Sequence, residues 1–172
     1  YHTCAIMDNG SAYCWGNGWN GRLGSGSTST STTPVAVLLP SGRTAVSISN
    51  GQYHSCSTLE NGSTYCWGRN NDGQLASSTI SWSDTPIFVS IPGASKSVLA
   101  MAGEFHSCTV TEDGSAYCWG NNNFGQLGDG TSSPSSTPVS VSFPSGVVVG
   151  YDSDVDGDGV IDSNDLFQNN PA

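Results

Sequence analysis

One short pattern recurs three times in this chain of 172 residues, always at the same spacing. Each copy contains an aromatic residue, a histidine, a serine or threonine and a cysteine, and a second cysteine follows ten positions later within Tyr-Cys-Trp-Gly. The first cysteines of the copies, Cys4, Cys56 and Cys108, lie 52 residues apart. A fixed period of this length is typical of repeat proteins, in which each unit buries its apolar face against the next.

The second copy shows what one unit is expected to contain. Val46–Ser49 alternates apolar and polar residues, which is the pattern of a half-buried strand. Cys56–Leu59 and Thr64–Trp67 flank an Asn-Gly dipeptide, which is preferred in tight hairpin turns. Thr85–Val89 supplies a further strand. Four short strands without a helical stretch predict an all-β fold made of four-stranded, propeller-type blades.

The six cysteines form three pairs, one in each copy, and each pair flanks a predicted turn. Free thiols in a reducing cytosol and metal ligands are the alternatives. Zinc sites usually contain cysteines separated by about two to four residues, with histidines placed to complete the set, and these pairs lack that spacing. Cysteines on facing strands favour disulfides, which persist in oxidising compartments. The expected bonds are Cys4–Cys14, Cys56–Cys66 and Cys108–Cys118.

The chain is acidic, with a formal net charge of −10 from 14 acidic residues and 4 lysines and arginines. This balance disfavours nucleic-acid binding and attachment to an anionic membrane surface, because both need a basic patch. No apolar run approaches the ~18 residues that a membrane-spanning helix needs. The sequence begins at Tyr1 in the middle of a copy, so we expect it to be processed or to be part of a longer protein.

Residues 103–130 contain, in order, Phe-His-Ser, Glu-Asp-Gly-Ser-Ala-Tyr, Trp-Gly and Asn-Asn-Asn-Phe-Gly-Gln-Leu-Gly-Asp-Gly. This succession resembles the regulator-of-chromosome-condensation repeat; residues 51–76 match it nearly as well, and residues 1–26 match with Arg22 in place of Gln. The resemblance implies a β-propeller over residues 1–150, and members of that family have seven blades. The cysteine-bearing variety resembles repeats of secreted microbial proteins. Because the chain has three repeats and the first lacks its first strand, we expect a partial propeller completed by further blades or by neighbouring chains.

The repeated histidines, His2, His54 and His106, are not expected to be catalytic, since an active site needs one convergent set of groups. We expect each histidine to bond to backbone within its own blade. The repeated tryptophans are expected in the core beside the disulfides: Trp15, Trp67 and Trp119. Trp19 and Trp82 have no counterparts in the other copies and are candidates for binding, although local packing is equally possible. No catalytic motif is evident, so we do not expect an enzyme.

Residues 151–172 form a separate acidic segment with the pattern of an EF-hand-type loop. Carboxylates occupy loop positions 1, 3, 5, 9 and 12, glycine occupies the sharp turn at position 6, and position 7 offers its carbonyl. Many hard oxygen ligands favour Ca²⁺ over Zn²⁺ or Mg²⁺; a disordered acidic tail is the alternative. The loop resembles those of dockerins and thrombospondin type 3 repeats. The predicted ligands are Asp154, Asp156, Asp158, Val160, Asp162 and Asp165, with Asp152 available to a second ion.

Two further features concern the surface. Asn9 and Asn61 begin Asn-Gly-Ser sequences that are acceptors for N-glycosylation, and residues 25–33 are rich enough in serine and threonine for O-glycans.

Val147–Val149 is an apolar strand beyond the third copy, and the first copy lacks a partner for its Cys4 strand. We expect these two to pair, between neighbouring chains or through a further blade.

Together these patterns predict a secreted, disulfide- and calcium-stabilised propeller module that acts as a structural component or as a surface for an extracellular protein or glycan. One alternative is a subunit of an extracellular filament or adhesin, assembled from copies of itself. Another is a protein inhibitor similar to the propeller-type β-lactamase inhibitors. The resemblance also raises nucleotide exchange on a small GTPase, which the inferred oxidising compartment disfavours. The expected location is extracellular or on the cell surface.

Overall fold

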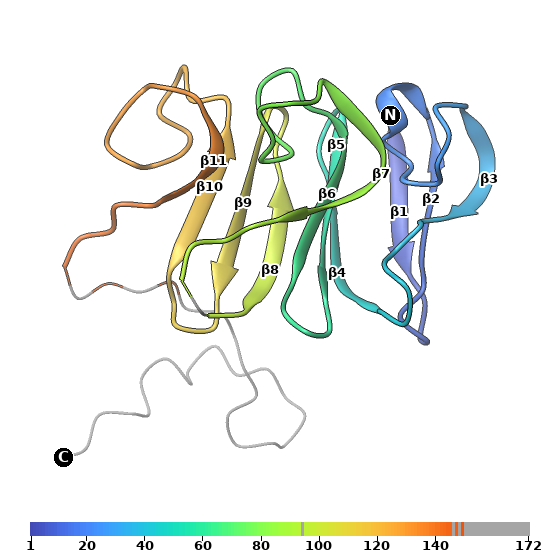
Figure 1. Cartoon of the computed structure of the whole chain (residues 1–172), viewed down its shortest axis with the longest axis horizontal. Coiled ribbons are helices and arrows are strands. Elements are labelled where there is room, and N and C mark those ends of the chain that lie inside the picture. Colours follow the sequence, from blue (N-terminus) through green and yellow to red (C-terminus); the bar gives the residue numbers. More distant parts are fainter. Residues whose placement is uncertain (94, 146, 148, 150–172) are drawn as a thin grey trace, which may run out of the picture.

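The computed structural model describes residues 1–93, 95–145, 147 and 149, which form three antiparallel sheets standing side by side (Figure 1). We call the sheets blades 1 to 3. The strands follow chain order within each blade. Blade 1 contains β1 (His2–Ile6), β2 (Ala12–Gly16) and β3 (Ser31–Ala36). Blade 2 contains β4 (Ala45–Asn50), β5 (His54–Leu59), β6 (Thr64–Arg69) and β7 (Trp82–Val89). Blade 3 contains β8 (Ser97–Ala102), β9 (His106–Thr111), β10 (Ala116–Gly120) and β11 (Ser135–Ser140).

The predicted all-β architecture is confirmed, with three strands in blade 1 and four in each of blades 2 and 3. The one helical element in the described part of the chain is a short 3₁₀ turn, η1 (Trp19–Gly21). In blade 2 the last strand, β7, begins at Trp82, earlier than the sequence pattern indicated. Pro86 lies inside this strand, opposite a register shift in β6. An edge strand with an irregular register tolerates a residue that has no N–H to donate.

A tight hairpin in each blade brings the paired cysteines to facing positions. In blade 2, Gly62 has a φ of +80°, which L side chains rarely adopt, and Cys56 then faces Cys66 across β5 and β6. Blades 1 and 3 have the same register at their own cysteines. The structure contains the three expected disulfides: Cys4–Cys14, Cys56–Cys66 and Cys108–Cys118.

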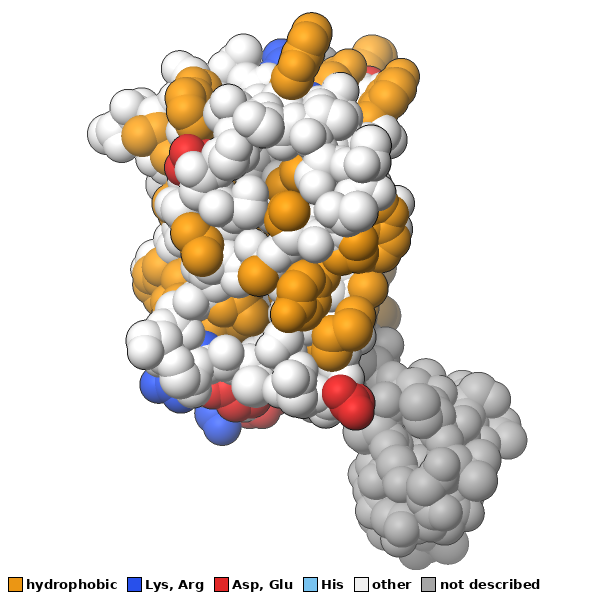
Figure 2. Space-filling model, turned by 90° about the vertical axis from the view of Figure 1, so that its right-hand side faces the viewer, with side chains coloured by type: hydrophobic (Ala, Val, Ile, Leu, Met, Phe, Trp, Pro, Cys, Tyr) orange, Lys and Arg blue, Asp and Glu red, His pale blue; other side chains and the backbone are white. Residues whose placement is uncertain are grey.

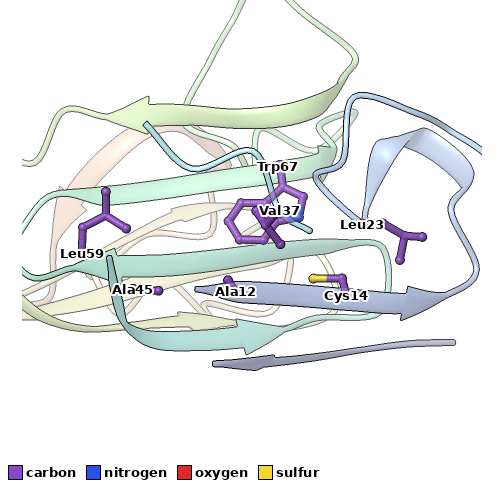
Figure 3. Packing of buried hydrophobic residues seen from close by; sticks show 7 residues of the cluster. All are labelled: Ala12, Cys14, Leu23, Val37, Ala45, Leu59 and Trp67. Atoms are coloured by element: carbon purple, nitrogen blue, oxygen red, sulfur yellow. The ribbon is translucent and has the colours of Figure 1, made fainter. Parts of the chain in front are cut away.

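The hydrophobic core lies between adjacent blades. Figure 3 shows the cluster at the junction of blades 1 and 2, where Leu59 and Trp67 of blade 2 pack against residues of blade 1. A second cluster at the junction of blades 2 and 3 contains Trp119, Ala100 and Leu75. Each blade therefore buries apolar surface mainly against its neighbours, as expected of a repeat protein.

Backbone hydrogen bonds also join each hairpin turn to the start of the chain segment that follows its blade. Three residues placed 52 positions apart donate these bonds: Ala45 N to Gly10 O (2.9 Å), Ser97 N to Gly62 O (3.0 Å) and Val149 N to Gly114 O (3.0 Å). Since the first two residues begin β4 and β8, Val149 occupies the position at which the first strand of a fourth blade would begin.

The expected pairing of Val147–Val149 with the Cys4 strand stays a prediction, because Val148 lies outside the described residues. Val147 donates its N–H to Pro144 O (3.1 Å), and the N–H of Val149 is also bonded within the chain. Ala45 makes the bond equivalent to that of Val149 and still pairs with Leu59 of β5, so this bond does not exclude a further strand. Among the described residues, no helix is long and apolar enough to span a membrane.

Candidate binding surface

Long loops follow β2, β6 and β10 and lie together at one end of the blades, at the top of Figure 1, whereas the hairpin turns lie at the other end. We call residues 17–30, 70–81 and 121–134 the loop surface. Buried asparagines fix two of these loops. The Oδ1 atom of Asn70 accepts from Leu75 N (2.8 Å), and its Nδ2 donates to the carbonyls of Ser77 (2.8 Å) and Ile80 (2.7 Å). Asn122 makes the corresponding bonds in blade 3.

Blade 1 has Gly18 at the position equivalent to Asn70, and its loop is held in a different way. A side chain at Gly18 would collide with the carbonyl of Ser29, so this loop closes by direct backbone contact. Gly21 has a φ of +76° and packs against the backbone of Asp84 in β7. The loop of blade 1 therefore lies directly on blade 2.

The two unrepeated tryptophans belong to this same junction. Trp19 begins η1 in blade 1 and is 69% exposed, while Trp82 begins β7 in blade 2 and is 45% exposed. Because η1 contacts β7, the junction of blades 1 and 2 carries both of these exposed aromatic side chains. The structure thus places on one junction the two residues that the sequence singled out as binding candidates.

A polar groove occupies the equivalent place between blades 2 and 3. It has a volume of about 670 Å³ and is lined by amide and hydroxyl side chains together with Asn71 and Pro134. These two residues lie 52 positions after Trp19 and Trp82. The junction of blades 1 and 2 therefore carries aromatic side chains at this place, whereas the junction of blades 2 and 3 is a polar groove there.

A row of arginine and aromatic side chains was not foreseen from the sequence. Tyr53 and Phe105 stack with ring centroids 5.7 Å apart, and the Arg69 guanidinium lies 5.1 Å from the first ring and 5.5 Å from the second. The Arg22 guanidinium lies 5.3 Å from the Tyr53 ring. Such cation–π contacts stabilise both partners.

The row is connected to the loop of blade 1. Arg22 Nε donates to the carbonyl of Trp19 (2.9 Å), and Nη1 donates to the carbonyl of Gln52 (3.1 Å). In blade 2, Arg69 forms an ion pair with Asp72 (3.3 Å). The backbone of Trp19 is therefore joined to the arginine–aromatic row by a direct hydrogen bond.

His2 and His54 bond to serine hydroxyls of the next blade instead of to backbone within their own blades, so that prediction is wrong for these two residues. His2 Nε2 lies 2.7 Å from Ser55 Oγ, and His54 Nε2 lies 2.7 Å from Ser107 Oγ. Each histidine thus contacts the next blade. Both serines are fully buried, and so is His54, whereas His2 is half-buried.

The hydrogen bonds also fix the tautomer of these rings. Ser107 Oγ donates to the carbonyl of Gln74 (2.8 Å), so its oxygen accepts from the Nε2–H of His54. The His54 Nδ1 atom is buried and has no partner among the described residues. A second proton there would be unsatisfied, and burial lowers the pKa of His54 to about 3. The pKa of His2 falls to about 4 for the same main reason.

Other predicted site residues lie elsewhere. Asn9 and Asn61 are in the hairpin turns, at the end opposite the loop surface, and each side-chain oxygen accepts a backbone N–H two residues later. The predicted calcium loop and its seven ligand positions lie outside the described residues. Within the part of the chain that is described, no group of three or more His, Cys, Asp or Glu could hold a metal ion.

The family model of the regulator of chromosome condensation (RCC1) repeat matches residues 9–57, 61–110 and 113–151. The chain belongs to the RCC1 repeat family. Its similarity to curated RCC1 relatives covers most of the chain. It is 32% identical over 145 residues to the ultraviolet-B receptor UVR8 of Arabidopsis thaliana, covering 83% of this chain and 32% of that protein. It is 29% identical over 136 residues to human E3 ubiquitin-protein ligase HERC2, covering 79% of this chain and 3% of that protein.

Solved RCC1-type structures have the same fold. Yeast RCC1 (Prp20), in its complex with Kap60, superposes with a TM-score of 0.73 at 22% identity, over 83% of this chain and 35% of that one. Human WBSCR16 superposes with a TM-score of 0.72 at 22% identity, over 81% of this chain and 35% of that one. The chain thus spans about a third or less of the length of these relatives. It is an RCC1-type propeller repeat module whose three disulfides indicate an oxidising, non-cytosolic location.

Proposed function

We propose that this chain is a secreted or cell-surface binding module that recognises a partner protein at the junction of blades 1 and 2, beside the loops of these two blades. The observation that carries the proposal is the pair of exposed tryptophans at the junction of blades 1 and 2. Trp19 and Trp82 are exposed there, and the buried Arg22 connects the carbonyl of Trp19 to the Tyr53 ring from below. Tryptophan is among the residues most enriched at the centres of protein interfaces.

The scaffold supports this proposal because it limits the entropy lost on binding. The disulfide of each blade crosses the hairpin that leads to its loop, and buried asparagines fix the loops of blades 2 and 3. A side chain held in place before binding loses less freedom when the partner arrives. The solved complex of yeast RCC1 with Kap60 adds the precedent of a related propeller that binds a protein.

The role of the tryptophans can be tested with a double variant, Trp19→Ala with Trp82→Ala. We expect at least a tenfold loss of affinity for the partner, because truncating a central aromatic residue costs more than about 1.4 kcal/mol. Since both side chains are exposed, the melting temperature should change little. The partner would be isolated from the native extracellular fluid or cell surface by cross-linking to the immobilised protein, and its affinity measured by interferometry.

Phe124→Ala is the matched control. Phe124 is 95% exposed in the loop of blade 3 and lies outside the junction of blades 1 and 2, so its loss should leave the affinity unchanged. Equal affinity of the double variant and the unsubstituted protein would show that the partner binds elsewhere. Competition by neutral oligosaccharides instead of protein would point to a glycan ligand and overturn the choice of partner class.

We further propose that the acidic segment binds Ca²⁺ through the carboxylates of its EF-hand-type loop. The sequence pattern supports this, because closely spaced like charges repel one another unless a cation offsets them. Titration calorimetry of the whole chain should show Ca²⁺ binding that Asp154→Asn with Asp158→Asn reduces by at least tenfold. Binding unaffected by these substitutions would refute the site, as would protease sensitivity around residues 150–168 that does not respond to a chelator.

A further inference from the structure

The polar groove between blades 2 and 3 is large enough to hold a small ligand. Its volume of about 670 Å³ falls within the range of about 300–1,000 Å³ that is typical of ligand pockets. The loop of blade 2 forms one wall, and the loop of blade 3 with the start of β11 forms the other. Both walls belong to consecutive blades of this chain, so the described residues form the groove by themselves.

Backbone contacts hold the two walls in place. Gly73 in the loop of blade 2 has a φ of +82°, and a side chain there would press against Ser136 in β11. Within the same loop, the N–H of Asn70 donates to the carbonyl of Ser81 (2.8 Å), and the Asn70 side chain fixes the residues between them. Groups that are held in place before binding lose less freedom when a ligand arrives.

Several side chains that line the groove have no hydrogen-bond partner in the described part of the chain. Asn71 in the loop of blade 2 and Asn123 in the loop of blade 3 are both exposed, and each has an unpaired amide group. The hydroxyls of Ser78, Ser81 and Ser136 are unpaired as well. Every one of these groups can both donate and accept. The groove therefore offers a ligand hydrogen-bonding groups from both walls.

The charges of the groove favour an uncharged ligand. Among the described residues that line it, Asp72 alone is charged. Its carboxylate forms an ion pair with Arg69 (3.3 Å) and accepts from Asn121 Nδ2 (3.3 Å). A cationic ligand would have to displace Arg69 from this carboxylate. An anionic ligand would find no lysine or arginine in the lining.

The lining is also poor in the side chains that anchor a protein partner. Its apolar side chains are Ile80 and Pro134, whereas protein interfaces centre on buried aromatic and other large groups. Hydrophobic side chains gather elsewhere on the molecule, as on the face of blade 1 shown in Figure 2. A sugar ring, with hydroxyls around its edge and C–H groups on its faces, matches a lining of amides and hydroxyls with two small apolar contacts.

We propose that the groove between blades 2 and 3 binds an uncharged saccharide. The amides of Asn71 and Asn123 hold the sugar hydroxyls from opposite walls, and the serine hydroxyls of the lining complete the contacts. The site is separate from the junction of blades 1 and 2, and it does not depend on partner binding there. At that junction the positions of Asn71 and Pro134 are occupied by Trp19 and Trp82, so the polar groove belongs to blades 2 and 3.

Protein NMR of the whole chain tests this proposal with neutral disaccharides as probes: maltose, cellobiose, lactose, mannobiose and chitobiose. At least one should shift the side-chain amide signals of Asn71 and Asn123. Because water competes for every neutral hydrogen bond, we expect a dissociation constant on the order of 1 mM. Digalacturonate is the anionic control and should bind at least tenfold more weakly than the best neutral probe.

The methyl glycoside of the best probe distinguishes two sources of the sugar. Methylation blocks the anomeric hydroxyl, through which a glycan is attached to a protein. Unchanged affinity for the methyl glycoside would support binding of an attached glycan. A tenfold loss of affinity would support binding of a free sugar in the same groove.

The double variant Asn71→Ala with Asn123→Ala removes one amide from each wall and should raise the dissociation constant at least tenfold. Both side chains are exposed and unpaired, so the fold should be retained, which circular dichroism would verify. Trp19→Ala, at the junction of blades 1 and 2, is the matched control and should bind the sugar normally.

Three results would overturn the proposal. The first is that no neutral probe shifts the groove signals up to its solubility limit. The second is equal sugar affinity of the double variant and the unsubstituted protein, and the third is digalacturonate binding as tightly as the best neutral probe. A loss of sugar affinity in Trp19→Ala alone would place the sugar at the junction of blades 1 and 2 and would also overturn the groove. Failure of the groove variants leaves the proposed partner binding intact, because that binding is measured with a different ligand and different variants.

Discussion

Replacing Trp67 by alanine is expected to lower the free energy of unfolding by about 3–5 kcal/mol. The side chain is fully buried at the junction of blades 1 and 2, in the cluster shown in Figure 3. The substitution leaves a large cavity and also removes the hydrogen bond from Trp67 Nε1 to the carbonyl of Arg22. Chemical denaturation followed by circular dichroism measures the loss.

Trp15→Ala is the matched control, because the same residue type occupies the equivalent position in blade 1. Trp15 is half-buried and has no blade before it among the described residues. Its removal should cost less than half as much as that of Trp67. Equal losses would mean that burial against a neighbouring blade is not the main source of stability.

Acid is expected to destabilise the protein between pH 6.5 and 4.5, before the carboxylates titrate. Burial lowers the pKa of His54 to about 3 and that of His2 to about 4, from an ordinary value of 6.5. Below pH 6.5 the unfolded chain takes up protons that the folded chain does not, so stability falls as the pH falls. Each histidine that stays neutral contributes a loss of about 1.4 kcal/mol per pH unit. Denaturant titrations at several pH values measure this slope.

The substitution His54→Gln separates this effect from other acid-sensitive groups. Glutamine can still donate to Ser107 Oγ but does not titrate, so the slope between pH 6.5 and 4.5 should become shallower whatever the baseline stability. The pKa values of Asp113, Asp129 and Glu60 are held low by hydrogen bonds, so their contribution is lost mainly below about pH 5. An unchanged slope in the variant would contradict the assignment of His54 as a neutral buried residue.

The sequence predicted those features that depend on local pattern and on the period. Alternating residues and an Asn-Gly turn place Cys56 opposite Cys66, so both the hairpin and the disulfide could be inferred. Trp19 and Trp82 were found because they interrupt the repeat. That they share one junction became evident only from the contact of η1 with β7.

The contacts between blades were harder to foresee. His54 and Ser107 are 53 positions apart, and a periodic pattern does not indicate which faces of successive units meet. The arginine–aromatic row was missed for another reason. Arg22 and Arg69 occupy different positions within their repeats, so the repeat pattern did not indicate that they are neighbours. In the structure both lie near the Tyr53 ring. The ligands expected for Ca²⁺ lie in residues 151–172 and stay a prediction.

Peptide mapping without prior reduction, on protein purified from its source, most directly tests whether this is a disulfide-bridged repeat module that works outside the reducing cytosol. We expect all six cysteines to resist alkylation and to appear in three linked peptide pairs, each within one repeat: Cys4–Cys14, Cys56–Cys66 and Cys108–Cys118. Free thiols would contradict the oxidising location, and links between repeats would contradict the blade register.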